Sequence, residues 1–313
     1  MSNNVAHAQN ADVTAIAEER RVEVEMTQET GSGAENQSVA RAIAILDLLA
    51  DSPPLGVREV ARQLDIAPSI ALRLLKTLSR ANYLEQSGEN ARYTIGYRAF
   101  RTGNAFLGQS TIHSAAMPEL HKLADQHING FLGVLRDHAV VYLATVPSSG
   151  PIALNHRPGA QTYLHSTALG KAILAEYTDA DVKQLLSEAP LPKLTPQTKV
   201  HVPKLLAELQ EVRRLGYAVN EEENRVGVYS AGAVVRNSDN QAIGAISGGV
   251  PSAGLTDKER TRVIKLVVDA ALSASRKLGA SVAGETTGTG RSFDRQRATP
   301  RAVGRITEPQ PRR

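Results

Sequence analysis

The chain contains no cysteine among its 313 residues. Disulfide bonds, thiolate zinc sites, iron–sulfur clusters and cysteine nucleophiles are therefore excluded. Tryptophan is also absent, and aromatic residues make up only 4% of the chain. The longest nearly continuous apolar run, residues 139–146, is far too short to cross a bilayer. The first residues lack a basic region followed by an apolar stretch, the pattern of a secretory signal, so we expect a cytoplasmic protein.

Motifs of common enzyme classes are missing as well. There is no Gly-x-Ser-x-Gly nucleophile elbow, no P-loop and no dinucleotide-binding glycine fingerprint. A hydrolase that uses the region of His165 and Ser166 is an alternative, but residues adjacent in sequence do not form a nucleophile–base pair. The histidines are scattered, and we expect residues 221–223, all Glu, to be a solvated strand end rather than a cation site. We therefore expect no enzymatic activity, no metal and no cofactor.

Charge is unevenly distributed along the chain. Residues 1–37 carry 2 basic and 7 acidic side chains, whereas residues 38–101 carry 9 basic and 6 acidic ones. The last segment, residues 279–313, carries 7 basic and 3 acidic side chains. Both ends are polar and poor in large apolar residues, so we expect disordered tails over residues 1–36 and 280–313, the second rich in Arg.

Residues 38–81 have the pattern of three short helices. Apolar residues recur at helical spacing from Val39 to Leu49, with Ser38 as the expected N-cap. A second helix is predicted over residues 57–64. The third begins at Pro68, because proline is tolerated in the first turn of a helix. Residues 83–86 and 91–95 are two short segments separated by a polar, glycine-containing turn. This pattern predicts a β-hairpin.

The outer face of the third helix carries small polar and basic residues, which is typical of a helix-turn-helix recognition helix followed by a wing. Arg73 and Lys76 can reach phosphates or guanine edges, and Ser69 can donate to a phosphate near the helix N-terminus. Ile70 and Leu72 could meet thymine methyl groups or pack against the first helix. A three-helix domain with a merely solvated basic face is the alternative. The predicted DNA-binding residues are Ser69, Ile70, Leu72, Arg73, Lys76, Thr77 and, in the wing, Arg92.

These segments resemble the IclR family of bacterial transcriptional regulators. The resemblance covers roughly residues 37–279 and is carried by residues 38–46, 67–78, 83–85, 93–96, 165–172, 216–223 and 227–228. It implies an α+β chain with an N-terminal winged helix-turn-helix domain (37–97), a linker helix (98–112) and a C-terminal GAF-like effector domain (113–279). Ser230 stands where the family frequently has Cys.

The pattern downstream of the linker agrees with an antiparallel sheet covered by helices. Strands are expected over residues 131–135, 139–146, 217–220, 228–236 and 242–250. Helices are expected over residues 114–127, 169–177, 179–187, 202–215 and 257–278, the last with Thr256 as its N-cap.

A ligand pocket is expected where small residues precede a helix start. The free N–H groups of the helix that begins near Ser166 or Thr167 favour an anion, unless these residues serve only as caps. Lys171 lies in the same first turn and could instead point to solvent. The predicted effector-binding residues are Ser166 and Thr167, from this helix start, and, by resemblance, Gly159, Ala160, Glu221, Val228, Ser230 and Ser247.

Together these observations predict a sequence-specific DNA-binding regulator, repressor or activator, controlled by a small anionic metabolite. One recognition helix covers few base pairs, so we expect a homodimer, or a tetramer made of dimers, on a near-palindromic operator of double-stranded DNA. A DNA-binding regulator without a small-molecule ligand is the alternative.

Overall fold

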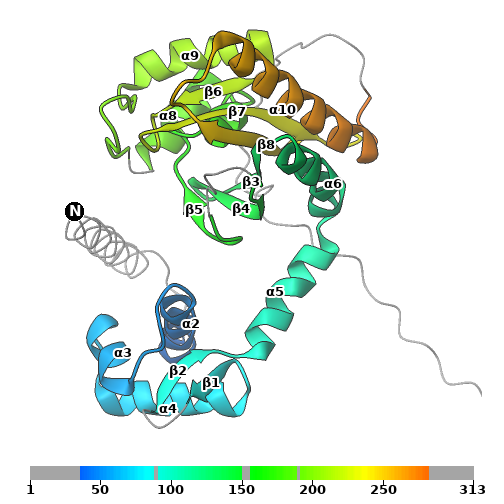
Figure 1. The fold of residues 1–313 in the computed structure, drawn as a ribbon. Coiled ribbons are helices and arrows are strands. Elements are labelled where there is room, and N and C mark those ends of the chain that lie inside the picture. Colours follow the sequence, from blue (N-terminus) through cyan, green and yellow to red (C-terminus); the bar gives the residue numbers. More distant parts are fainter. Residues whose placement is uncertain (1–35, 88–90, 150–155, 189–190, 282–313) are drawn as a thin grey trace, which may run out of the picture. The chain divides into compact units, whose positions relative to one another are not determined.

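The computed structural model describes residues 36–87, 91–149, 156–188 and 191–281. The chain divides into two compact units between Asn104 and Ala105 (Figure 1), and each is described by itself. The predicted disordered tails, residues 1–36 and 280–313, lie almost entirely outside the described residues. In the described part of the chain, no helix is both long and apolar enough to span a membrane.

The first unit has the predicted order of helices and hairpin. Its elements are α2 (Gln37–Ala50), α3 (Val57–Gln63), α4 (Pro68–Arg80), β1 (Leu84–Ser87) and β2 (Arg92–Ile95). The two strands pair antiparallel. Side chains from all three helices and both strands form one buried core that includes Ile45, Val60, Leu75, Leu84 and Tyr93.

The predicted cap of the first helix was wrong by two residues. Asn36, not Ser38, is the N-cap of α2, and its side-chain oxygen accepts a hydrogen bond from the Ser38 N–H at 3.2 Å. Both residue types cap helices well. The hydrogen bond places Ser38 inside the first turn of the helix.

The segment after the hairpin forms two helices, as predicted, but their boundary lies earlier than expected. The predicted linker helix, 98–112, is observed as α5 (Tyr97–Gln109), and the following helix is α6 (Thr111–Asp125). Ser110 separates them because its hydroxyl caps α6, accepting from the His113 N–H at 3.4 Å. No side chain of α5 is buried in the described structure.

The second unit is built on a six-stranded antiparallel sheet with the order β5-β4-β3-β8-β7-β6 among the described residues. Its strands are β3 (Asn129–Arg136), β4 (Ala139–Val146), β5 (Gln161–Thr162), β6 (Ala218–Glu221), β7 (Val228–Arg236) and β8 (Ala242–Pro251). The remaining helices are α7 (Ala168–Leu174), α8 (Asp179–Ser187), α9 (Val202–Leu215) and α10 (Asp257–Lys277). This α+β architecture matches the predicted one.

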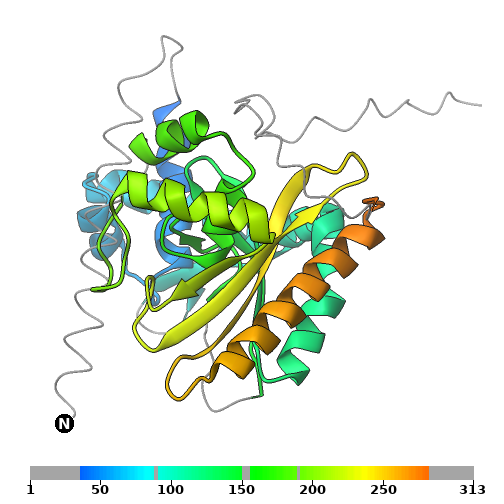
Figure 2. The ribbon, with the colours of Figure 1, turned by 90° about the horizontal axis from the view of Figure 1, so that it is seen from above.

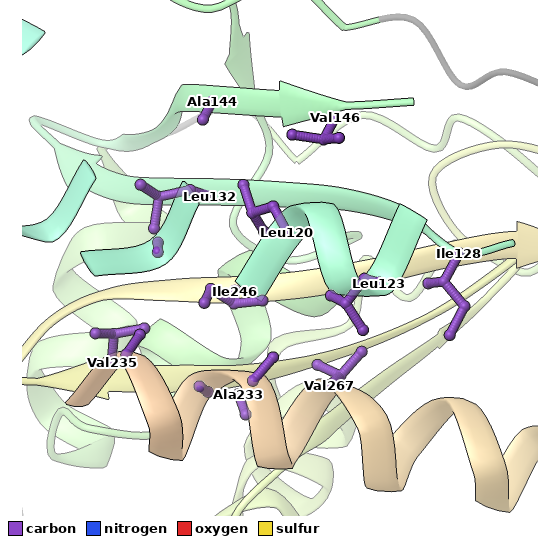
Figure 3. Packing of buried hydrophobic residues seen from close by; sticks show 14 of the residues in the cluster. Leu120, Leu123, Ile128, Leu132, Ala144, Val146, Ala233, Val235, Ile246 and Val267 are labelled. Carbon is purple, nitrogen blue, oxygen red and sulfur yellow. The ribbon is translucent and has the colours of Figure 1, made fainter. Parts of the chain in front are cut away.

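Each face of the sheet has its own apolar layer. Helices α6 and α10 lie side by side on one face (Figure 2), where Leu120, Leu132, Ile246 and Val267 belong to one buried cluster (Figure 3). Helices α7, α8 and α9 contribute to the second cluster, which includes Phe131, Tyr142 and Leu169.

Glycine lets α7 approach the sheet very closely. A Cβ atom added at Gly232 of β7 would lie 2.6 Å from the carbonyl oxygen of Ala168, well inside van der Waals contact. Because Gly232 has no side chain, the start of α7 rests directly on β7. This contact brings Thr167 and Ala168 beside the strands that line the cavity described below.

Candidate functional site

The outer face of α4 in the first unit is polar and accessible. Ser69, Leu72, Arg73, Lys76 and Thr77 are exposed, whereas Ala71, Leu74 and Leu75 on the opposite side are buried. Neither Arg73 nor Lys76 forms an ion pair in the described part of the chain. Both cations are therefore free to meet an external anion.

Two of the predicted recognition residues are less available than the sequence suggested. Ile70 is partly buried and packs against the core of the first unit, so it supports α4 rather than projecting outward. The hydroxyl of Thr77 donates to the Arg73 carbonyl at 2.9 Å and is thus engaged within the helix.

Arg92 is placed differently from the predicted phosphate contact. Its guanidinium pairs with the Glu59 carboxylate at 2.9 Å and donates to the Pro54 carbonyl at 2.7 Å. A hydrogen bond from the Gly56 N–H and the pairing with Arg92 hold the pKa of Glu59 below its ordinary value. Arg92 therefore fastens the wing strand β2 to the start of α3.

The second unit contains a small, partly open cavity at the start of α7, with a water-accessible interior of about 40 Å³. It draws residues from five strands and from α7, which explains why no short sequence segment could define it. Of the predicted effector residues, it brings together Thr167, Val228, Ser230 and Ser247. The described residues that line it are Phe131, Tyr142, His156, Thr167, Ala168, Leu169, Asn220, Val228, Ser230, Ser247 and Gly249.

Four predicted effector residues lie outside this lining. Glu221 is exposed and pairs with Arg260 at 2.6 Å, because its neighbour Asn220 is the β6 residue that faces the cavity. Ser166 is buried and donates to the Asn224 side chain at 3.1 Å. Gly159 and Ala160 instead pair with the Tyr142 backbone. The Gly159 N–H donates to the Tyr142 carbonyl at 2.7 Å, and the Ala160 carbonyl accepts from the Tyr142 N–H at 3.0 Å.

Three aromatic rings that sequence analysis missed form one wall of the cavity. The His156 ring stacks on Tyr142 with 4.8 Å between centroids, and it meets Phe131 edge-on at 5.5 Å. Burial raises the pKa of Tyr142 to about 12. Burial, and after it the charge of Arg225, lowers the pKa of His156. Both rings are therefore neutral near pH 7.

The same cavity also contains hydrogen-bonding groups, and one of them, Ser247, is the cross-strand neighbour of Phe131. Ser230 and Ser247 have hydroxyls without a protein partner among the described residues. Asn220 also lines the cavity, and its side-chain oxygen accepts from the Glu223 N–H at 2.8 Å, so its NH2 group is the part left for another partner. The Thr167 hydroxyl is already committed, since it donates to the Tyr163 carbonyl and accepts from the Gly170 N–H. Its role in the structure is that of a cap.

Beside the cavity lie charged side chains whose burial was not predicted from the sequence. Glu223 was expected at a solvated strand end but is 3% exposed, and Lys171 is completely buried. The Lys171 ammonium binds the Glu223 carboxylate at 2.6 Å. Within the described residues, no group of three or more His, Asp or Glu side chains is arranged to hold a metal ion.

Comparison with known proteins agrees with this architecture. Residues 38–88 match the IclR helix-turn-helix domain, and residues 105–276 match the bacterial transcriptional regulator IclR C-terminal domain. The HTH-type transcriptional regulator BhcR of Paracoccus denitrificans is 32% identical over 252 residues, which are 78% of this chain and 90% of BhcR.

Solved structures show the same fold. An IclR transcriptional regulator from Alicyclobacillus acidocaldarius is 25% identical, with a TM-score of 0.70 over 78% of this chain and all of the other. An IclR homologue from Microbacterium hydrocarbonoxydans, complexed with 4-hydroxybenzoate, is 20% identical, with a TM-score of 0.69 and the same coverage. On the two matched domains and the BhcR identity, this chain belongs to the IclR family of DNA-binding bacterial transcriptional regulators.

Proposed function

We propose that this regulator is controlled by a small aromatic carboxylate bound in the cavity of the effector domain, residues 113–279. The observation that carries the proposal is the presence, in one cavity, of neutral aromatic rings and of hydrogen-bonding groups without a protein partner. The rings of Phe131, Tyr142 and His156 suit a planar ligand, and Ser230, Ser247 and Asn220 suit its polar substituents. The homologue from Microbacterium hydrocarbonoxydans, solved with 4-hydroxybenzoate, shows such a ligand on this fold.

An anionic ligand is favoured by the charge at this site. None of the described lining residues carries a carboxylate. The exposed guanidinium of Arg225 lies close enough to His156 to lower the pKa of that ring, so it adds positive potential beside the cavity. We therefore expect Arg225→Gln to weaken the binding of carboxylates more than that of the corresponding neutral amides.

The test is a thermal-shift and calorimetric comparison of 4-hydroxybenzoate, benzoate and pyruvate with 4-hydroxybenzamide. Stabilisation by an acid but not by its amide, abolished by Ser247→Leu, is the expected result. Ser187→Leu on the exposed end of α8 is the control for adding the same side chain elsewhere. If no acid stabilises the protein, the ligand-free alternative, a DNA-binding regulator that responds only to protein partners, replaces this proposal.

For DNA we propose that the domain of residues 37–97 reads a near-palindromic operator through Arg73, with Ser69, Leu72 and Lys76 beside it on the exposed face of α4. Such a protein acts in the cytoplasm, where the bacterial chromosome lies. Selection of binding sites from random duplexes at moderate salt should enrich two half-sites in opposite orientation. Enrichment of a single half-site, or of none, contradicts the proposal.

The operator symmetry requires a homodimer, or a tetramer of two dimers. Apolar side chains left exposed in the single chain support this association. Val39 and Ile43 lie one turn apart on α2, at 53% and 54% exposed, and Phe100 on α5 is 69% exposed. A monomeric mass in light scattering at micromolar concentration would count against the dimer.

We also infer that the His165 and Ser166 region is not a hydrolytic site. The His165 ring nitrogen Nε2 lies 3.2 Å from the Pro192 carbonyl, and the Ser166 hydroxyl donates to Asn224. Neither contact is that of a nucleophile with its base. Hydrolysis of 4-nitrophenyl acetate by the purified protein at a rate above that of its Ser166→Ala variant would refute this inference.

A further inference from the structure

A cluster of four charged side chains, two of them buried, lies beside the cavity. The Lys171 side chain is 0% exposed, and its ammonium binds Glu208 at 2.7 Å and Glu223 at 2.6 Å. Lys199 joins the same two carboxylates, at 3.0 Å to Glu208 and 3.4 Å to Glu223. Burial alone would lower the pKa of Lys199, but the two carboxylates outweigh burial and raise it. The cluster therefore holds two positive and two negative charges.

Glu223 connects this cluster to the cavity. Its carboxylate binds Lys171 of α7, and its backbone N–H donates to the Asn220 side-chain oxygen at 2.8 Å. Its carbonyl accepts hydrogen bonds from the hydroxyls of Thr198 at 2.6 Å and Thr195 at 3.3 Å. One residue thus joins a cavity-lining side chain to α7 and to the segment before α9.

The arrangement is poorly suited to stability alone. Buried ion pairs contribute little net stability because both ions lose their hydration. The second carboxylate oxygen of Glu223 is buried without a hydrogen-bond partner among the described groups, a feature that native proteins seldom tolerate. The preceding residue, Glu222, has φ 58°, in the left-handed region that is costly for a residue with a side chain. Residues 222 and 223, beside the cavity, therefore combine an unfavourable backbone conformation with a buried charge.

We propose that Lys171 and Glu223 are positioning residues of the effector site, which hold the loop of residues 222–227 so that Asn220 presents its NH2 group to the ligand. With its oxygen bound to the Glu223 N–H, the Asn220 amide cannot rotate by half a turn without losing that bond. The site then offers a hydrogen-bond donor at this point and selects a ligand with an acceptor there, such as a carboxylate or carbonyl oxygen. This inference rests on the proposed function in taking the cavity as the effector site.

The test replaces the ion pair by apolar side chains of similar length, Lys171→Met with Glu223→Met. Lys199 and Glu208 remain paired with each other, so no buried charge is left alone. The control is Lys277→Met with Glu119→Met, which removes another ion pair with a buried carboxylate in the same unit, at 2.7 Å between α10 and α6. Three quantities are measured for both: melting temperature, hydrogen exchange of residues 218–230, and affinity for 4-hydroxybenzoate.

We expect the Lys171→Met/Glu223→Met protein to melt near the wild-type temperature, since apolar replacement of a buried pair is often neutral. Its exchange at residues 220–227 should be faster by roughly tenfold, and its affinity for 4-hydroxybenzoate weaker by roughly tenfold, as expected for the loss of a few local hydrogen bonds. The control pair should leave both quantities unchanged, even if its melting temperature falls.

Wild-type exchange and affinity in the Lys171→Met/Glu223→Met protein would overturn the proposal, as would equal changes in the control. If the double variant does not fold, Glu223→Gln keeps the side-chain shape and the backbone N–H. It should give the same changes at roughly threefold, the effect of one weakened hydrogen bond. If the wild type binds no carboxylate, the proposed effector fails, whereas hydrogen exchange in the ligand-free protein still decides whether the ion pair holds the loop.

Discussion

Gly232→Ala adds a single methyl group where α7 touches the sheet, and it should damage the effector cavity without touching the ligand. The new Cβ would lie 2.6 Å from the Ala168 carbonyl oxygen, 2.7 Å from its carbonyl carbon and 3.2 Å from its Cβ. The first two contacts are with backbone, so no side-chain rotation relieves them. The start of α7 must retreat by about 0.8 Å to restore ordinary contact.

The cost follows from this displacement. Overpacking by one methyl group typically destabilises a protein by roughly 1–3 kcal/mol, and each kcal/mol lowers the melting temperature of a domain of this size by roughly 2–4 °C. Thr167, Ala168 and Leu169 line the cavity and move with α7. We therefore expect affinity for 4-hydroxybenzoate to fall by about tenfold, measured by calorimetry, since small misplacements of binding groups are costly.

Gly248→Ala is the matched control on the neighbouring strand. Its Cβ would lie 2.6 Å from methyl groups of Ile128 and Val267, which belong to the apolar layer on the α6 and α10 face. It should lower the melting temperature to a comparable extent and leave ligand affinity intact. An equal loss of affinity in both variants would show that reduced stability of the whole unit, rather than displacement of α7, weakens ligand binding. Unchanged stability and affinity in Gly232→Ala would refute the packing argument itself.

The order of the elements could be predicted because it rests on local signals. Helix α10 was expected over residues 257–278 with Thr256 as its cap, and it is observed over Asp257–Lys277 with that cap. The break between α5 and α6 was expected between residues 112 and 114 but lies at Ser110, because apolar spacing alone does not locate the end of a helix. Only the hydrogen bond from His113 distinguishes a capping serine there from one within a helix.

The site was less predictable, for two physical reasons. Side chains alternate along a strand, so an error of one residue in β6 exchanged Asn220, which lines the cavity, for Glu221, which binds Arg260. The second reason is distance along the chain. Lys171 and Glu223 are 52 residues apart, and charged residues are almost never fully buried without a partner, so sequence alone favours solvent for both.

Three further predictions concern the DNA-binding face and pH. Arg73→Ala should cost roughly 1–3 kcal/mol on the selected operator and little on random DNA, whereas Lys76→Ala should weaken both and flatten the salt dependence measured by fluorescence anisotropy. Arg92→Ala and Glu59→Gln should each weaken operator binding. The double variant should bind only slightly more weakly than either single variant, because both changes break the same contact between the wing and α3. Additive losses would instead indicate that Arg92 contacts a DNA phosphate directly. The last prediction follows from His156, whose pKa burial lowers below its ordinary value of 6.5. The unfolded chain then binds a proton more tightly than the folded one, so the contribution to stability is complete above the ordinary pKa and is lost as pH falls below it. His165 is shifted in the same direction, chiefly by burial, so both rings contribute. Calorimetric melting between about pH 7.5 and about pH 5.5, the range in which an ordinary histidine titrates, should show a falling melting temperature with a shallower slope in His156→Phe, which keeps an aromatic ring against Tyr142. An identical slope in that variant would mean that the imidazole does not titrate with folding, and that the neutral aromatic wall needs another explanation.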